Sequence, residues 1–139
     1  MALVHKNKND NAKCVVGNAE NPPFQISTFD TLLSSLTLHW CNIDSNLFLK
    51  LSNLLIPNGL FLFSVAGPDT FKEFKKCPPD IYEKLRFNEY LDMHHYGDFL
   101  LQSDFRDPVV DNEQITIEFP TFSQLLNSCL LYTSDAADD

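Results

Sequence analysis

The strongest constraint on the fold is a strand–helix–strand pattern over residues 31–66. Residues 31–36 form an apolar run with small serines and residues 59–66 a nearly continuous apolar run, and both are typical of strands covered on both faces of a sheet. Between them, Asp44 or Ser45 can cap a helix, and Pro57-Asn58-Gly59 supplies the turn that ends it. The apolar residues of this helix fall on one face, which comprises Leu47, Phe48, Leu51, Leu54 and Leu55. The pattern therefore predicts a parallel β-α-β unit.

Weaker patterns flank this unit. A β-branched run at residues 13–16 predicts a short strand. After the unit, a helix is expected from Asp69 or Thr70 to Lys76, and two more at residues 81–91 and 96–103, the last with Phe99 and Leu100 facing inward. The alternation of Ile115, Ile117 and Phe119 predicts an edge strand within residues 108–119. A further helix is expected over residues 121–127.

Length and charge narrow the class of protein. The chain has 139 residues, enough for one domain and too few for two. Ten Lys and Arg residues against nineteen Asp and Glu give a net charge of −9, which argues against a nucleic-acid binder. No apolar stretch is long enough to cross a bilayer, and no charged-then-apolar leader opens the chain. Four widely spaced cysteines without a Cys-x-x-Cys pair indicate reduced thiols, so we expect a cytoplasmic protein without a membrane partner.

The carboxyl terminus changes character after residue 128. Residues 129–139, Cys-Leu-Leu-Tyr-Thr-Ser-Asp-Ala-Ala-Asp-Asp, resemble a translated transposon-type sequencing adaptor. A frayed acidic terminus is the ordinary alternative. We therefore expect the native domain to occupy residues 1–128 and residues 129–139 to be a non-native tail.

Several short motifs, taken in chain order, resemble those of class I S-adenosylmethionine-dependent methyltransferases. The family patterns are Asp-Ala-Glu-x-Leu-Pro-Phe, Phe-Asp, a strand end with serine or asparagine, and a Lys-Pro-Gly-Gly turn. Their counterparts here are Asn18-Ala19-Glu20-Asn21-Pro22-Pro23-Phe24, Phe29-Asp30, Ser34-Ser35-Leu36-Thr37-Leu38-His39-Trp40 and Leu55-Ile56-Pro57-Asn58-Gly59-Leu60. Within that superfamily, Leu91-Asp92-Met93-His94-His95-Tyr96-Gly97-Asp98, running into Phe105-x-Asp107-Pro108, is similar to the malonyl-acyl-carrier-protein O-methyltransferases of biotin synthesis.

The resemblance implies an α/β fold, a doubly wound Rossmann-like sheet of seven strands. Residues 1–128 would hold the third to sixth strands, so that the first two strands, with the glycine-rich loop, and the last strand are lacking. The glycines of the chain, Gly17, Gly59, Gly67 and Gly97, form no Gly-x-Gly sequence. We therefore expect a fragment of a methyltransferase domain, inactive by itself and monomeric when intact.

The resemblance also implies an S-adenosylmethionine site at the carboxyl ends of the strands, where open α/β sheets bind ligands. Asn18 would accept a hydrogen bond from the adenine amino group, without the charge of the family's Asp. Ala19 would offer its backbone N–H to the adenine ring. Ser34, Ser35 and Leu36 would lie under the cofactor, and His39 and Trp40 would contact the substrate above the methyl-transfer site.

For the intact enzyme, the implied reaction is O-methylation of the free carboxylate of malonyl-acyl-carrier protein. This carboxylate is ionised at neutral pH and needs no general base, so no catalytic residue is assigned, and His39 is the only candidate considered for that role. Arg86 is the candidate to bind the carboxylate, because its guanidinium pairs bidentately. Other basic residues nearby could dock the acidic carrier protein, or form an ordinary solvated helix face: Lys72, Lys75, Lys76 and Lys84.

Two other functions fit the same residues. One is that of the related complex I assembly factor, a methyltransferase-fold protein of the protein-arginine hydroxylase type, which shares the Leu-His-Trp and Pro-Asn/Asp-Gly patterns. The other is a non-catalytic binding module without a cofactor site. A metal site is not expected, because adjacent residues such as His94 and His95 point in different directions on a helix. Capping of the following helix by Asp92 or His94 explains this segment better.

Overall fold

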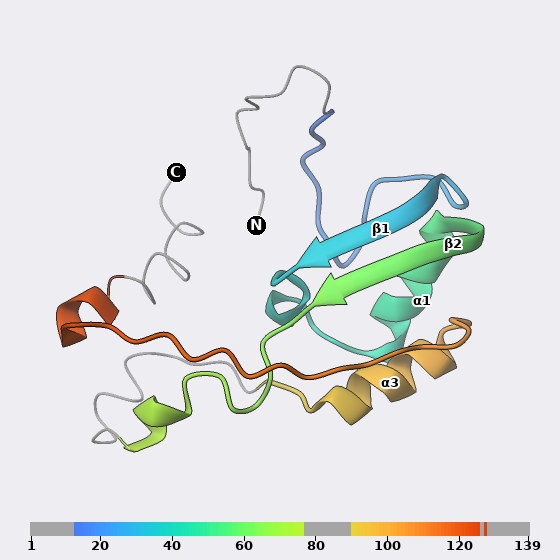
Figure 1. The fold of residues 1–139 in the computed structure, drawn as a ribbon. Coiled ribbons are helices and arrows are strands. Elements are labelled where there is room, and N and C mark those ends of the chain that lie inside the picture. Colours follow the sequence, from blue (N-terminus) through green and yellow to red (C-terminus); the bar gives the residue numbers. More distant parts are fainter. Residues whose placement is uncertain (1–12, 77–89, 126, 128–139) are drawn as a thin grey trace. The chain divides into compact units, whose positions relative to one another are not determined.

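The computed structural model describes residues 13–76, 90–125 and 127 (Figure 1). The chain divides into two units, Met1–Asn18 with Glu113–Asp139, and Ala19–Asn112. Among its described residues, 19–76 and 90–112, the second unit holds two strands, two α-helices and two short 3-10 helices. These are β1 Phe29–Ser35, η1 Leu38–Trp40, α1 Ser45–Leu54, β2 Leu55–Ser64, η2 Lys72–Lys76 and α3 Met93–Gln102.

The predicted β-α-β unit is confirmed. Strands β1 and β2 pair in parallel, with Leu33 opposite Leu62, and α1 connects them. Helix α1 is capped, as expected, by Asp44, whose carboxylate accepts a hydrogen bond from the Leu47 N–H at 2.8 Å. The apolar helix face expected from the sequence is buried in full: Leu47, Phe48, Leu51, Leu54 and Leu55.

The predicted turn at residues 57–59 lies inside β2, which begins directly after α1. Leu55 lies opposite Phe29, but Leu60 lies opposite Thr31, so β2 has extra residues at this point. Pro57 has no N–H to give to a ladder, and Asn58 is left-handed at φ 64°. A Cβ atom on Gly59 would lie 3.0 Å from the carbonyl oxygens of Asp30 and Ile56, so this close approach of the two strands requires glycine.

One face of the sheet is covered by both helices. The fully buried ring of Phe48, from α1, contacts four other rings at centroid distances of 5.7 to 6.4 Å: Phe61 and Phe63 of β2, and Tyr96 and Phe99 of α3. Since Phe61 and Phe63 pack in the same cluster as Phe48 and Tyr96, α1 and α3 lie on one side of β2 (Figure 1).

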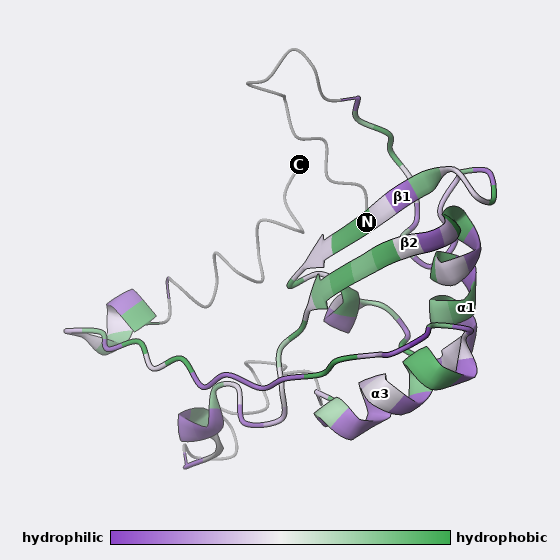
Figure 2. Ribbon diagram, turned by 45° about the vertical axis from the view of Figure 1, so that its right-hand side comes forward, coloured by the Kyte–Doolittle hydropathy of each residue, from purple (hydrophilic) through white to green (hydrophobic). Residues whose placement is uncertain are grey.

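The opposite face of the sheet is apolar as well, but within the Ala19–Asn112 unit it is largely exposed. Its side chains alternate with those of the covered face along each strand. Leu33, Leu60 and Leu62 are 76%, 52% and 49% exposed. Figure 2 shows that apolar residues continue along the middle of both strands.

Helix α3 confirms the helix expected at residues 96–103, with an earlier start. The carboxylate of Asp92 accepts a hydrogen bond from the His94 N–H at 3.0 Å, so Asp92 is the predicted cap. Leu100 is buried and Phe99 is half-buried. At the other end, Ser103 is fully buried, and its hydroxyl donates to the carbonyl oxygen of Ser45, at the start of α1, at 2.9 Å.

Two of the strand predictions are wrong. Neither residues 13–16 nor residues 108–119 belong to a strand, and Ile115 and Ile117 are 74% and 69% exposed. A strand requires a hydrogen-bonding neighbour, and β1 and β2 form the one sheet among the described residues. Alternating sequence alone therefore does not make either segment a strand.

Two predicted helices differ from expectation in extent. The segment from Asp69 forms a turn followed by the short 3-10 helix η2, because Phe71 is left-handed at φ 57° and interrupts α-helical geometry. Residues 122–125 are helical as expected, and the Thr121 hydroxyl accepts from the Gln124 N–H at 3.3 Å. Tyr90 and Leu91 are not helical; the rest of the helix expected at residues 81–91, and the tail at residues 129–139, lie outside the described residues.

Candidate functional site

The carboxyl end of β1 is held in place by the end of β2. Leu36, the residue after β1, is left-handed at φ 47°. Its N–H donates to the carbonyl oxygen of Ser64 at 3.0 Å and lies 3.1 Å from the Ser64 hydroxyl. The Thr37 hydroxyl donates to the carbonyl oxygen of Ser35 at 2.8 Å. These bonds turn the chain away from the sheet and lead it into η1.

Helix η1 places two aromatic side chains in different environments. His39 is buried, with 7% of its surface exposed, whereas Trp40 is 50% exposed. Their ring centroids are 5.2 Å apart. The His39 ring also meets the ring of Tyr90 edge to face at 5.5 Å. His39 thus faces the segment that precedes α3.

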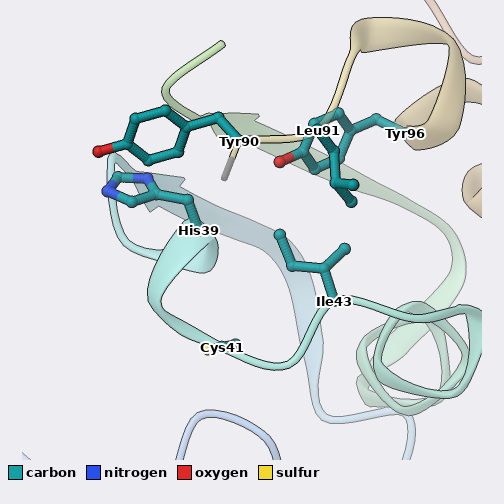
Figure 3. Close-up of a pocket in the computed structure, with 6 residues that line it drawn as sticks. All are labelled: His39, Cys41, Ile43, Tyr90, Leu91 and Tyr96. Carbon is teal, nitrogen blue, oxygen red and sulfur yellow. The ribbon is translucent and has the colours of Figure 1, made fainter. Parts of the chain in front are cut away.

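A pocket of about 180 Å³ lies where η1, the loop before α1 and the start of α3 meet (Figure 3). Its lining residues come from all three segments. They are His39, Cys41, Ile43, Tyr90, Leu91 and Tyr96. The pocket combines the apolar side chains of Ile43 and Leu91 with imidazole, thiol and phenol groups. All six residues lie in the Ala19–Asn112 unit.

The pocket contains two buried polar atoms without a hydrogen-bond partner in the described structure, Nδ1 of His39 and the hydroxyl of Tyr96. Burial lowers the pKa of His39, so its imidazole is neutral near pH 7. Burial raises the pKa of Tyr96. Burial, together with the negative charge of Glu20, also raises the pKa of Cys41, which keeps the thiol protonated. His39, Cys41 and Tyr96 are therefore uncharged at physiological pH.

The Ala19–Glu20 turn is attached to the same region. The Glu20 carboxylate accepts a hydrogen bond from the Asn42 N–H at 2.7 Å, and the Glu20 carbonyl oxygen accepts from Lys50 Nζ at 3.0 Å. Ala19 is exposed beside it. Asn18, its predicted partner in adenine binding, is exposed and belongs to the other unit.

The residues at the carboxyl end of β1 offer groups of the kind that part of an S-adenosylmethionine site requires. Leu36, at 39% exposed, offers apolar surface to an adenosyl group, and the hydroxyls of Ser34 and Ser35 offer hydrogen bonds. The Leu36 N–H is already bonded to Ser64 and is not available. The chain has no Gly-x-Gly sequence to cradle a charged group with backbone N–H groups. This edge therefore supplies surface and hydroxyls but no backbone cradle.

The other predicted site residues are distributed as follows. Trp40 does not line the pocket, whereas His39 does. Lys72 and Lys76 lie on η2, partly buried and exposed respectively, with Glu73 between them. The side chain of Lys75, and Lys84 and Arg86 as a whole, lie outside the described residues.

Sequence reasoning missed most of the pocket. Tyr96 and Leu91 belong to a segment that was interpreted only as a family motif and a helix cap, and Tyr90 was not considered. The available signal was that Tyr96 shares a helix face with the inward-facing Phe99 and Leu100, which places its hydroxyl in an apolar interior. A buried tyrosine usually has a hydrogen-bond partner, so a tyrosine at that position marks a polar site.

Neither a metal centre nor a membrane span emerges from the described residues. Across residues 13–76 and 90–125, no three His, Cys, Asp or Glu side chains gather as metal ligands. His94 and Asp92 approach to 3.8 Å, but both are exposed. No helix in the same part of the chain is long and apolar enough to cross a membrane.

Comparisons with known proteins point to one family. Residues 1–63 match the model of a methyltransferase domain. The malonyl-[acyl-carrier protein] O-methyltransferase of Legionella pneumophila subsp. pneumophila is 34% identical over 112 residues, which cover 81% of this chain and 39% of that protein. The protein of the same name from Gallionella capsiferriformans is 35% identical over 105 residues, covering 76% of this chain and 36% of the relative. No solved structure gives a significant match.

A relative whose name gives a different activity also matches. The mitochondrial arginine-hydroxylase NDUFAF5 of Danio rerio is 28% identical over 122 residues, which cover 83% of this chain and 38% of that protein. The chain thus spans about two fifths of the length of the curated relatives it matches. Over residues 1–63 the chain is similar to a methyltransferase domain, and over most of its length it is similar to the malonyl-acyl-carrier-protein O-methyltransferases.

Proposed function

We propose that the full-length gene product transfers a methyl group from S-adenosylmethionine to the free carboxylate of malonyl-acyl-carrier protein, a step of biotin synthesis. The observation that carries the proposal is the similarity to relatives of that name. It reaches 34% to 37% identity in three of them and extends over 105 to 112 residues, beyond the 63 residues matched by the general methyltransferase domain.

The chemistry requires positioning more than proton transfer. A malonyl carboxylate is already ionised at neutral pH, so one of its oxygens can attack the electrophilic methyl group directly. The rate then depends on the alignment of the two groups in a site that shields both from water. The buried, neutral imidazole of His39 suits a binding role in such a site and is not required as a base.

The cofactor and carrier sites complete the proposal. Asn18, Ala19, Ser34, Ser35 and Leu36 would form part of the S-adenosylmethionine site, with further strands of the sheet supplying the rest. His39, Trp40 and Arg86 would contact the substrate. The acidic carrier protein would dock on basic side chains of η2 and of the following segment, namely Lys72, Lys75, Lys76 and Lys84. We place the intact enzyme in the cytoplasm as a monomer.

The test is methyl transfer by the full-length gene product, with isotope-labelled S-adenosylmethionine and malonyl-acyl-carrier protein. Label should appear on the carrier as a base-labile methyl ester. Acetyl-acyl-carrier protein is the matched control, because it has the same thioester arm and no free carboxylate. Label on the acetyl form, or on neither form, would contradict carboxylate methylation.

Charge reversal tests the docking surface separately. In an active enzyme, Lys75→Glu with Lys76→Glu should raise the KM for malonyl-acyl-carrier protein and leave the KM for S-adenosylmethionine unchanged. The effect should weaken at high salt, since exposed charges are screened. An unchanged KM would assign these lysines to an ordinary solvated surface.

A second candidate is protein-arginine hydroxylation, supported by the 28% identity to the arginine-hydroxylase of Danio rerio. Mass spectrometry distinguishes the two activities directly. Methylation adds 14 mass units to the acyl carrier, because CH₂ is added, whereas hydroxylation adds an oxygen atom to an arginine of a protein substrate.

A further inference from the structure

The pocket between η1 and the start of α3 has two unused hydrogen-bonding groups on opposite sides. Nδ1 of His39 and the hydroxyl of Tyr96 are both buried and without a partner in the described structure. His39 and Tyr96 are only 7% and 2% exposed. Buried polar groups are nearly always satisfied by protein, water or ligand. Figure 3 shows that the Tyr96 hydroxyl points away from α3, toward the side of the pocket where His39 and Tyr90 lie.

The size of the pocket limits its occupant. At about 180 Å³ it is below the range of roughly 300–1,000 Å³ that is usual for drug-sized ligands. It therefore does not accommodate a nucleoside or a whole cofactor. It is large enough for a short group of a few heavy atoms, such as the acyl end of a carrier-bound substrate.

The chemistry of the pocket limits the occupant further. Ile43 and Leu91 form an apolar wall, and burial keeps both His39 and Tyr96 uncharged. A carboxylate would lose its hydration there without meeting a cation. A neutral carbonyl oxygen has two lone pairs, and Tyr96 O–H and a neutral imidazole with its proton on Nδ1 can each donate to one.

We propose that this pocket binds the thioester carbonyl of the malonyl group, with Tyr96 and His39 as the hydrogen-bond donors and the carboxylate held outside. The proposal rests on the proposed function and adds to it a site that separates the neutral end of the acyl group from the charged end. His39 lies three residues after Leu36 in the chain, so this wall of the pocket is near the sheet edge assigned to the cofactor. Tyr96 and His39 then act as specificity residues for the acyl group.

The first experiment uses Tyr96→Phe in the full-length enzyme. This change removes only the hydroxyl and keeps the ring that packs against Phe48 and Phe63, so the fold should persist. We expect the KM for malonyl-acyl-carrier protein to rise about tenfold, the size of effect expected from one neutral hydrogen bond. The kcat and the KM for S-adenosylmethionine should change little.

A matched control removes a hydroxyl far from the pocket. Ser52 lies on α1 and donates only to the carbonyl oxygen of Leu49 in the same helix, at 2.9 Å. Ser52→Ala should therefore leave all kinetic constants unchanged. Equal effects of the two substitutions would overturn the pocket assignment.

A second experiment removes the carbonyl instead of the hydroxyl. A carrier bearing a 2-carboxyethyl thioether retains the carboxylate and the chain length but replaces the thioester C=O by CH₂. The wild-type enzyme should bind this analogue roughly a hundredfold more weakly than the thioester, because the bonds from both Tyr96 and His39 are lost, whereas in Tyr96→Phe the difference should fall to roughly tenfold, because only the bond from His39 remains to be lost. If replacing the carbonyl weakens binding by the same factor in the wild-type enzyme and in Tyr96→Phe, the hydroxyl does not bind the carbonyl. That result would assign Tyr96 a purely structural role and reject the proposal.

The outcomes separate this inference from the proposed function. An active wild-type enzyme whose Tyr96→Phe variant shows an unchanged KM would overturn the pocket and leave malonyl methylation in place. A wild-type enzyme that does not methylate malonyl-acyl-carrier protein would overturn both. A rise in KM that is specific to the thioester would support both.

Discussion

The two faces of the β1–β2 sheet are built from similar residues and lie in different environments. On one face, Phe61 and Phe63 pack against α1 and α3 around the fully buried Phe48. On the other, Leu33 and Leu62 lie opposite one another and are 76% and 49% exposed. In the middle of the strands, over residues 32–33 of β1 and 60–63 of β2, the sequence shows no difference in polarity between the faces, since both are apolar (Figure 2). Such a pattern is typical of a sheet covered on both sides.

The difference in exposure between the two faces shows that an apolar strand face indicates an environment in which that face would be covered, even where it is exposed in this structure. An exposed row of leucines on a sheet is a surface for binding or association. The class I methyltransferase fold provides a reason for that row, because its sheet carries helices on both faces. The exposed face therefore supports the proposal that further structure completes the sheet in the full-length gene product.

The largest expected effect is on the covered face. Phe48→Ala should lower the free energy of unfolding by about 3–5 kcal/mol, because it removes a fully buried ring that contacts four others. Urea denaturation followed by circular dichroism measures this loss. A loss below about 1 kcal/mol would contradict the packing of α1 and α3 around this residue.

The next largest effect is expected at Gly59, where β1 and β2 approach each other closely within the sheet. Gly59→Ala should cost about 1–3 kcal/mol, since the new Cβ would lie 3.0 Å from two backbone oxygens. Gly67→Ala is the matched control, because nothing lies within 4 Å of a Cβ atom there. The control should be neutral or slightly stabilising. Equal costs at the two glycines would contradict the β1–β2 register.

The stability of the fold should depend on pH through the buried side chain of His39. The folded protein holds the pKa of His39 below its ordinary value of 6.5, so the unfolded chain takes up the proton first. Stability from this group is present above pH 6.5 and is lost as the pH falls through the folded pKa. His39→Gln should reduce this loss in acid denaturation curves. Curves of identical slope for wild type and variant would contradict the burial of His39.

The smallest effect is expected on the exposed face. In the 139-residue chain, Leu33→Ala should change the free energy of unfolding by no more than about 0.5 kcal/mol. In the full-length gene product, if helices cover this face as proposed, the same change should cost about 2–5 kcal/mol. Equal small effects in both proteins would contradict the proposed completion of the sheet.

The central fold could be predicted from sequence because its signals are local and agree with one another. Asp44 caps α1, the apolar helix face is buried, and two apolar runs form the parallel strands. Residues 108–119 failed because alternation shows which side chains would share a face and not whether a neighbouring strand exists. The segment after Asp69 failed because the positive φ of Phe71 has no sequence signal; bulky aromatic residues rarely adopt it.

The candidate site was predicted less completely than the fold. His39 was named from its position after a strand, and it does line the pocket. Tyr90 and Tyr96 come from a distant segment, and only the packing of α3 against α1 brings Tyr96 close to η1. Pockets built between segments remote in sequence depend on tertiary packing, which periodicity does not encode.

The hydrogen bond from Ser103 to Ser45 has a consequence for the order in which the chain folds. It joins residues 58 positions apart. Closing a loop of that length costs on the order of 3–4 kcal/mol of chain entropy, whereas one hydrogen bond contributes about 0.5–1.5 kcal/mol. The bond therefore cannot recruit α3 by itself. The aromatic rings must therefore supply most of the attraction between the helices. Apolar helix faces can pack in several alignments, and the hydrogen bond of the serine hydroxyl favours one of them.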